Sequence, residues 1–277
     1  SEAGGGGGFG GGGGTGSIAG KGGHFGGDGV ANNVAGGGGA LGGSVFATRN
    51  AIVLIGDNVT STSNAVTPGL GGNSGTGYAP DIFLYQGAQV QFVGASSQTI
   101  SFAIQGDTSA TVGNYDGGVL INPTSGSAII TFNSNTNSYN GGTNIQTGTL
   151  KIATGNLPTT GNVNVQSGTT LTLLTNTVAT AGTFNNAGSL NIQATFTPTH
   201  YTSFNNTGTV YSIGLGSIGS NVTATGALSI GRDSTGATNA NAFSTGNAIS
   251  FTSINVYNTS SLTTTGAGSM TGNLYML

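Results

Sequence analysis

The chain has 277 residues, of which 55 are glycine and none is cysteine, and its formal net charge is −3 with only 4% charged residues. A mean hydropathy of +0.07 with so little net charge differs from the low-hydrophobicity, high-charge composition of disordered chains. The four fixed cations are scattered, which argues against a nucleic-acid partner, and no apolar run approaches the roughly 20 residues of a membrane helix.

Residues 1–46 form a glycine-rich segment with stretches such as AGGGGGFGGGGGTG and apolar anchors that include Phe9 and Phe25. Glycine lacks a Cβ, so it takes positive φ freely and lets backbones approach closely. Two ordered forms are consistent with this composition. The segment could make tight entry coils of a repetitive fold, which we favour, or polyproline-II-like strands packed against each other.

The remainder, residues 47–277, carries β-type patterns. The segment 47–61 reads as the first strong strand, and the Gly/Pro/Asn-rich segment 67–81 reads as an external loop. Helix is disfavoured throughout, because Gly, Asn, Thr and Ser dominate and the strong helix formers Glu, Lys and Arg are nearly absent.

A short motif recurs at intervals of about 20 residues: a turn-like glycine followed by an alternating apolar segment, as in TGTLKI and AGSLNI. The glycines that mark the series are Gly87, Gly126, Gly148, Gly168, Gly188, Gly208, Gly226 and Gly246. Short strands at a fixed period without helices predict an all-β, single-stranded right-handed parallel β-helix, a β-solenoid with coils of about 20 residues. The alternation places the aliphatic residues inward; Val210 and Ile213 are one such pair.

Two stretches, TFNNAGSLNI and SFNNTGTVYSI, repeat the same order of residues one such interval apart. In a solenoid of this period, each residue of the first stretch lies one coil below its counterpart. We therefore predict a structural ladder of stacked side chains, as in parallel in-register strands. Its members are Phe184, Asn185, Asn186, Phe204, Asn205 and Asn206.

The stretch YNGGTNIQTGTLKIATGNLPTTGNVNVQSGTTLTL, which begins at Tyr139, resembles the β-strand repeat associated with bacterial autotransporter passenger domains. The stretch GGGGALGGSVF is similar to glycine-rich entry segments of the same outer-membrane proteins. The resemblance implies a right-handed β-helix exported to a Gram-negative cell surface. The family's C-terminal translocator barrel is not seen in this sequence, and the family includes both adhesins and enzymes, so the resemblance bears on topology more than on activity.

Possible catalytic motifs in the glycine-rich regions are weak. GNSGTG around Ser74 faintly echoes a serine-protease loop, but Asn73 stands where that loop has Asp, and His24 lacks the corresponding motif. Lys21 is followed by Gly22 rather than Ser or Thr, which argues against a P-loop. The isolated Asp28 lacks the repeated acids of calcium-binding nonapeptide repeats, although one structural Ca²⁺ stays open.

The few titratable residues suggest no further site. His24 and His200 are far apart in sequence, so a transition-metal site is not predicted. Sugar hydrolysis needs two carboxylates about 5–10 Å apart. The acids that would have to cluster are Asp57, Asp81, Asp107 and Asp116.

We therefore expect a non-enzymatic, extracellular or cell-surface protein with a structural or adhesive role and no cofactor, metal or catalytic residue. Open strand edges at the solenoid ends predict head-to-tail self-association into filaments or a coat. Other expected partners are surface components or a glycan receptor; nucleic acid and membrane insertion are not expected. The alternatives are a carbohydrate-active β-helix enzyme and an ice- or surface-binding solenoid. Functional residues are expected in loops that break the period and at the two ends.

Overall fold

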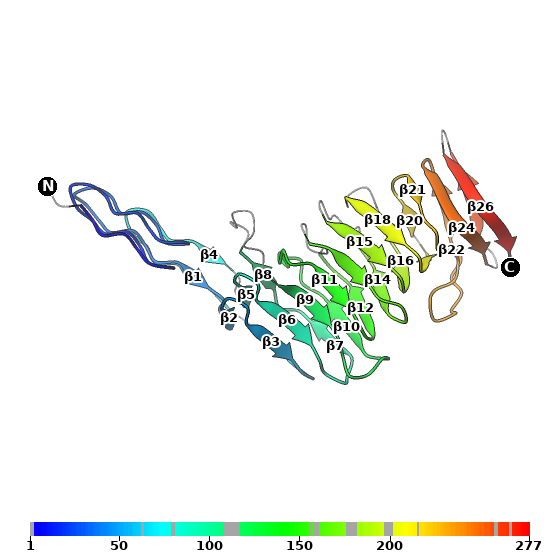
Figure 1. The fold of residues 1–277 in the computed structure, drawn as a ribbon, viewed down its shortest axis with the longest axis horizontal. Helices are drawn as coiled ribbons and strands as arrows, with labels where there is room; N and C mark the ends of the chain where they lie inside the picture. The colour runs from blue at the N-terminus through cyan, green and yellow to red at the C-terminus, as the bar shows by residue number, and fades with distance from the viewer. Residues whose placement is uncertain are drawn as a thin grey trace.

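The structure is a computed structural model, and it confirms the predicted fold class. The residues it describes are 3–61, 64–78, 81–107, 117–155, 157, 161–175, 182–196, 202–214, 216–257, 260–265 and 268–277. Within them the chain is all-β and has no helix, and its parallel strands stack into about eight coils of roughly 21 residues (Figure 1). This arrangement is a β-solenoid.

Each coil contributes strands to up to three parallel sheets. The longest, here called the long sheet, has ten strands: β7 (Gln98–Ile100), β10 (Ile129–Phe132), β12 (Thr149–Ile152), β14 (Thr170–Leu173), β16 (Ser189–Ile192), β19 (Thr209–Ser212), β22 (Ala227–Ile230), β24 (Ala248–Val256), β21 (Val222–Thr223) and β26 (Ser269–Met276). A seven-stranded sheet contains β3 (Ile52–Ile55), β6 (Gln89–Phe92), β9 (Gly118–Ile121), β11 (Thr143–Ile145), β13 (Val163–Val165), β15 (Thr183–Asn186) and β18 (Ser203–Asn206).

Shorter sheets complete the coils. A three-stranded sheet contains β2 (Val45–Ala47), β5 (Ile82–Leu84) and β8 (Ile104–Gly106). The two-stranded sheets pair β1 (Ala40–Leu41) with β4 (Gly77–Tyr78), β17 (Thr195–Phe196) with β20 (Ser217–Ile218), and β23 (Ala242–Thr245) with β25 (Ser261–Thr264).

The register of the long sheet shows where the predicted period applies. In the central coils it aligns Ile129, Thr149, Thr170, Ser189, Thr209 and Ala227, whose residue numbers advance by close to the predicted interval at each step. Two steps that flank this range are longer: Ile52 pairs with Gln89, and Ala227 pairs with Ser253. The last step returns to the predicted interval, since Ser253 pairs with Asn273. The predicted period therefore holds in the central coils and again in the last one, and longer coils lie between and before them.

The marker glycines follow the register only in part. Backbone N–H groups of the next coil donate to the carbonyls of Gly148, Gly188, Gly208 and Gly226, which stack in one column together with Thr169. A Cβ on Gly208 would collide with the carbonyl oxygen of Gly188, so this position requires glycine.

Four markers depart from the predicted column. Ala128 and Thr169 occupy the positions proposed for Gly126 and Gly168, as the donors to their carbonyls show. Gly87 precedes β6 in the seven-stranded sheet and so lies on another face. The N–H of Thr252 donates to the carbonyl of Gly226, so Thr252 occupies the position that was expected for Gly246. These glycines keep a nearly regular spacing in sequence but occupy other positions around the coil.

The inward ladders of the long sheet form the core. One ladder has the buried residues Leu150, Leu171, Leu190, Val210, Leu228 and Ile254, each worth roughly 1.5–3 kcal/mol on burial. In the neighbouring ladder the register places Ser212, and not the predicted Ile213, between Ile192 and Ile230. Ser212 is fully buried, donates to the carbonyl of Gly216 at 2.8 Å and accepts from Nδ2 of Asn241 at 2.7 Å. Ile213 is buried as well, but beside the ladder.

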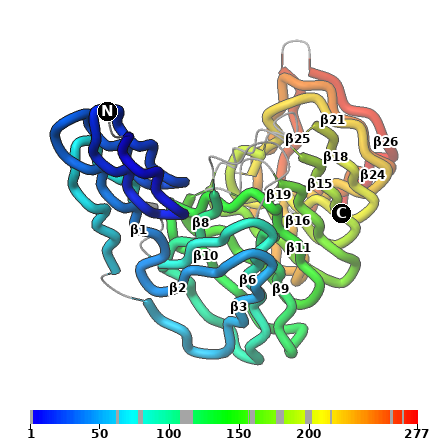
Figure 2. The backbone as a smooth tube through the Cα atoms, turned by 60° about the vertical axis from the view of Figure 1, so that its left-hand side comes forward, coloured from blue at the N-terminus to red at the C-terminus, as the bar shows by residue number. Residues whose placement is uncertain are grey.

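Residues 3–41 and 66–78, here called the glycine bundle, project from the solenoid as extended strands lying side by side (Figures 1 and 2). The N–H groups of Gly4, Gly7, Gly10 and Gly13 donate to the carbonyls of Ile18, Lys21, His24 and Gly27 at 2.8–2.9 Å. Both donors and acceptors advance by three residues, which is the repeat of a polyproline II helix. This spacing favours packed polyproline-II-like strands over the entry coils preferred on the basis of sequence.

Of the segment 67–81, predicted as an external loop, residues 67–78 lie outside the coils and add to the glycine bundle. The N–H groups of Gly69 and Gly72 donate to the carbonyls of Gly38 and Ala35, and β4 pairs with β1. The bundle therefore combines residues on both sides of the first coil, and its extent differs from the sequence-based segment 1–46.

Aromatic rings join the glycine bundle to the outer side of the three-stranded sheet. Phe83 of β5 is fully buried, because Phe25 lies edge-on against it at 5.5 Å between centroids and Phe46 stacks on it at 5.6 Å. Phe9 contacts Tyr85 at 4.8 Å. Aromatic side chains thus help to hold the two parts together.

The two ends of the solenoid differ. At the first coil, Val59 packs against the core, as Val45 and Val53 do. At the last coil, Leu274 and Met276 of β26 continue the inward ladders above Ile254 and Val256, yet they are 56% and 68% exposed. Within the described residues no strand covers the outer edge of β26.

Candidate binding site

The loop between β22 and β23 belongs to a lengthened coil, in which Ala227 pairs with Ser253, and it folds into a tight turn. Oδ1 of Asp233 accepts three hydrogen bonds. The N–H and the hydroxyl of Thr235 donate to it at 2.9 Å and 2.7 Å, and the N–H of Ala237 donates at 3.0 Å. The N–H of Asp233 donates to the carbonyl of Ala237 at 2.9 Å. This short side-chain cap explains why an Asp-Ser-Thr-Gly sequence makes a defined turn here.

The turn is fastened to the outer side of the long sheet. Nδ2 of Asn191 on β16 donates to Oγ of Ser234 at 2.9 Å, and the N–H of Ser234 donates to Oδ1 of Asn191 at 3.2 Å. Asn191 is only 6% exposed, so these reciprocal bonds are shielded from water. They fix the loop across neighbouring coils.

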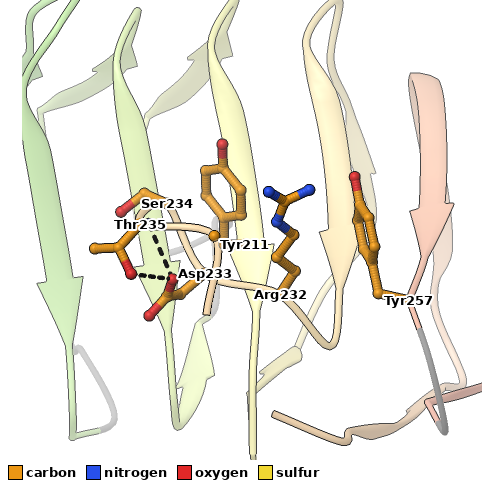
Figure 3. Close-up of a pocket in the computed structure, with 7 residues that line it drawn as sticks. Tyr211, Arg232, Asp233, Ser234, Thr235 and Tyr257 are labelled. Atoms are coloured by element: carbon orange, nitrogen blue, oxygen red, sulfur yellow. Dashed lines mark hydrogen bonds between the residues drawn. The ribbon is translucent and has the colours of Figure 1, made fainter. Parts of the chain in front are cut away.

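A cavity of about 280 Å³ lies between this turn and two tyrosines of neighbouring coils, Tyr211 on β19 and Tyr257 just after β24 (Figure 3). Arg232 stands between the two rings, and its guanidinium carbon lies 5.2 Å from the centroid of Tyr257. The hydroxyls of both tyrosines and the guanidinium nitrogens point in the same direction, toward the top of Figure 3.

Arg232 makes no hydrogen bond or ion pair with another side chain among the residues the structure describes; its contact with the ring of Tyr257 holds it in place. A planar guanidinium presents its N–H groups in a fork that matches a carboxylate or phosphate. The cavity therefore offers an oriented donor fork and two aromatic rings.

The other fixed cations differ in their surroundings. Nζ of Lys21 pairs with Asp28 at 2.6 Å, and Arg49 donates from Nε to Gln86 at 2.8 Å. Lys151 lies on the outer side of β12 and, like Arg232, has no carboxylate partner among the described side chains. The two unpaired cations therefore belong to one sheet and its loop.

The acids that were candidates for sugar hydrolysis have different hydrogen-bond partners. Asp57 accepts from the N–H of Ser96 at 2.7 Å, and backbone hydrogen bonds from Ser96 and Ala95 lower its pKa. Oδ2 of Asp81 accepts from the N–H of Ala103 at 2.8 Å. Burial raises the pKa of Asp81, but hydrogen bonds from Ala103, Asn64 and Ser61 outweigh it and leave the pKa lowered. Asp116 and His200 lie outside the described residues.

The remaining sequence candidates have structural contacts. Nε2 of His24 lies 2.7 Å from Oδ2 of the buried Asp107, across the junction of glycine bundle and solenoid. The side-chain hydrogen bond from Lys21 and the N–H of Gly22 lower the pKa of Asp28. The carbonyl of Ser74 packs against Gly27 within the bundle. In the described residues no three His, Asp or Glu side chains form a metal-binding group.

The predicted Phe-Asn-Asn ladder is present. β15 pairs with β18 so that Phe184 lies on Phe204, Asn185 on Asn205 and Asn186 on Asn206. The phenylalanine centroids are 5.5 Å apart, and amide hydrogen bonds of 2.9 Å and 2.6 Å join the outer and inner asparagine pairs. The ladder belongs to the architecture and lines no cavity described here.

Comparisons with protein-family models, curated proteins and solved structures found no match to this chain. Across the described ranges no helix is both long and apolar enough to cross a membrane. The fold defines a class, the parallel β-solenoids, and the residues of the cavity have to carry the argument for function.

Sequence reasoning missed this cavity, because it treated Arg232 only as one of four scattered cations. The available signal was a break in the period between β22 and β24. The regular spacing from Gly226 to Gly246 concealed that break, since Gly246 is not the register partner of Gly226.

Proposed function

We propose that this protein is a non-enzymatic structural or adhesive element of a cell surface, exported in the manner that its likeness to autotransporter repeats suggests. The observation that carries the proposal is the architecture: a stack of parallel coils extended at one end by the glycine bundle, giving an elongated body (Figure 1). An elongated body of this kind can extend away from a cell surface and present ligand-binding loops along its sides.

Self-association of this chain is part of the proposal. The long sheet ends in β26 at one end of the stack, and β2 and β3 are the outermost strands of their sheets at the other. Unpaired strand edges are templates for pairing with another chain, and a head-to-tail contact of this kind propagates. Because Val59 already packs on the core at the first coil, the junction there would rest on the edges of β2 and β3.

Light scattering over a wide concentration range, with electron microscopy of the same samples, tests the proposal. We expect the mean mass to rise with concentration and the images to contain coaxial rods longer than one molecule. A constant monomer mass at high concentration would rule out self-association. Catalytic cleavage of a polysaccharide by the purified chain would replace the structural role with an enzymatic one.

A further inference from the structure

The outer side of the long sheet carries a continuous column of polar and aromatic residues. The register aligns Thr131, Lys151, Thr172, Asn191, Tyr211, Ser229, Asn255 and Tyr275 on successive strands. Neighbouring strands are roughly 4.8 Å apart, so the column has a regular step. Asn191, which is bonded to Ser234 of the loop, and Ser229 are buried, so the accessible track includes Lys151 and Thr172 and resumes at Tyr211. No strand of the long sheet contains Asp or Glu.

Two of the fixed cations bond no other side chain among the described residues, and both lie on this track or beside it. Lys151 is a member of the column, and Arg232 projects next to Tyr211 from the loop that crosses it. Lys151 precedes Tyr211 by three strands, which corresponds to about 14 Å at the usual strand spacing. The one acid of the cavity, Asp233, uses Oδ1 to cap its own turn.

The cavity chemistry selects for an anion attached to an apolar ring. The fork of Arg232 is oriented by Tyr257 and can form two parallel hydrogen bonds with a carboxylate. The rings of Tyr211 and Tyr257 combine an apolar face with a hydroxyl tip. A sugar ring presents C–H groups to such a face, and a uronic acid adds the carboxylate.

We propose that the outer side of the long sheet binds an extended, carboxylate-bearing polysaccharide, with Arg232 holding one uronate at the cavity and Lys151 contacting a uronate farther along the chain. The inference rests on the proposed adhesive role and names its ligand class. Binding requires no chemical step. The partly exposed hydroxyls of Thr172 and Tyr211 replace water bound to the sugar hydroxyls.

Titration calorimetry with oligogalacturonates of different lengths tests the proposal, with a neutral dextran oligosaccharide and a sulfated oligosaccharide as comparison ligands. We expect wild-type protein to bind the longer oligogalacturonate, with affinity that falls as salt rises. R232Q should weaken binding at least tenfold for every length. K151Q should weaken binding of the long oligomer alone, because a short one does not reach both cations.

R49Q is the matched control: it removes a cation that already bonds a neutral amide, Gln86, and lies elsewhere on the molecule. It should bind like wild type, and circular dichroism verifies that all three variants are folded. Unchanged affinity in R232Q, equal affinity for dextran, or tighter binding of the sulfated ligand would overturn the assignment. Absence of oligogalacturonate binding with intact self-association would overturn this inference alone, whereas binding without self-association would overturn only the filament.

Discussion

At the scale of single residues, the two asparagine pairs of β15 and β18 have the same chemistry in different surroundings. Nδ2 of Asn186 donates to Oδ1 of Asn206 at 2.6 Å, and both side chains are almost fully buried. Nδ2 of Asn205 donates to Oδ1 of Asn185 at 2.9 Å on the outer side. Water can replace the outer bond but not the inner one, so their contributions to stability should differ.

Asn206→Ala should therefore lower the free energy of unfolding by about 1–3 kcal/mol, because it leaves the buried Nδ2 of Asn186 without its nearest acceptor. Chemical denaturation of the purified variant measures this change. Asn205→Ala is the control: the same substitution one residue away should change stability by less than about 0.5 kcal/mol. Equal losses in the two variants would contradict the ladder as we describe it.

At the scale of elements, the glycine bundle depends on backbones approaching where no side chain fits. A Cβ on Gly36 would collide with the carbonyl oxygen of Gly27, whereas a Cβ on Gly5 would meet nothing within 4 Å. Overpacking of this kind costs about 1–3 kcal/mol. Gly36→Ala should thus open the bundle, and Gly5→Ala should leave it closed.

Hydrogen exchange of the bundle amides measures this difference, since Gly4, Gly7 and Gly13 are protected by bonds to the neighbouring strand. We expect faster exchange at these positions in Gly36→Ala, with exchange in the solenoid strands unchanged. Gly5→Ala should exchange like wild type. If both variants exchanged alike, close backbone contact would not be what holds the bundle together.

The elements also differ in how far sequence could predict them. The central coils repeat with inward aliphatics such as Leu171 and Leu190, and each stacks on its own counterpart, so period and register follow from the pattern. A run of glycines has no side-chain pattern that could distinguish entry coils from polyproline-II-like strands. The cavity was not predicted, because the longer coil that ends at Ser253 still has an apparently regular spacing of glycines.

At the scale of the whole molecule, the long sheet joins the proposed ligand track to the proposed junction. Its strands run continuously from β7 to β26, so a copy added coaxially at β26 would place a second track farther along the same axis. Self-association and polysaccharide binding would then reinforce each other through multivalency, because one polymer could contact several copies.

The outer edge of β26 is where such a junction can be tested. Leu274 faces inward on the ladder of Leu228 and Ile254, so another coil placed on β26 would bury it. Leu274→Lys should keep the molecule monomeric in light scattering, because an unpaired ammonium would have to be desolvated at the junction. Leu274 is 56% exposed in the single molecule, so the folded monomer should tolerate the change.

Tyr275→Lys is the matched control, since Tyr275 lies on the same strand, is 49% exposed and faces outward along the column. This variant adds the same charge without placing it in the junction, and it should associate like wild type. Association of Leu274→Lys at wild-type concentrations would exclude β26 as the junction. Loss of association in both variants would instead indicate that charge anywhere on the last strand opposes it, and the coaxial arrangement would lose its support.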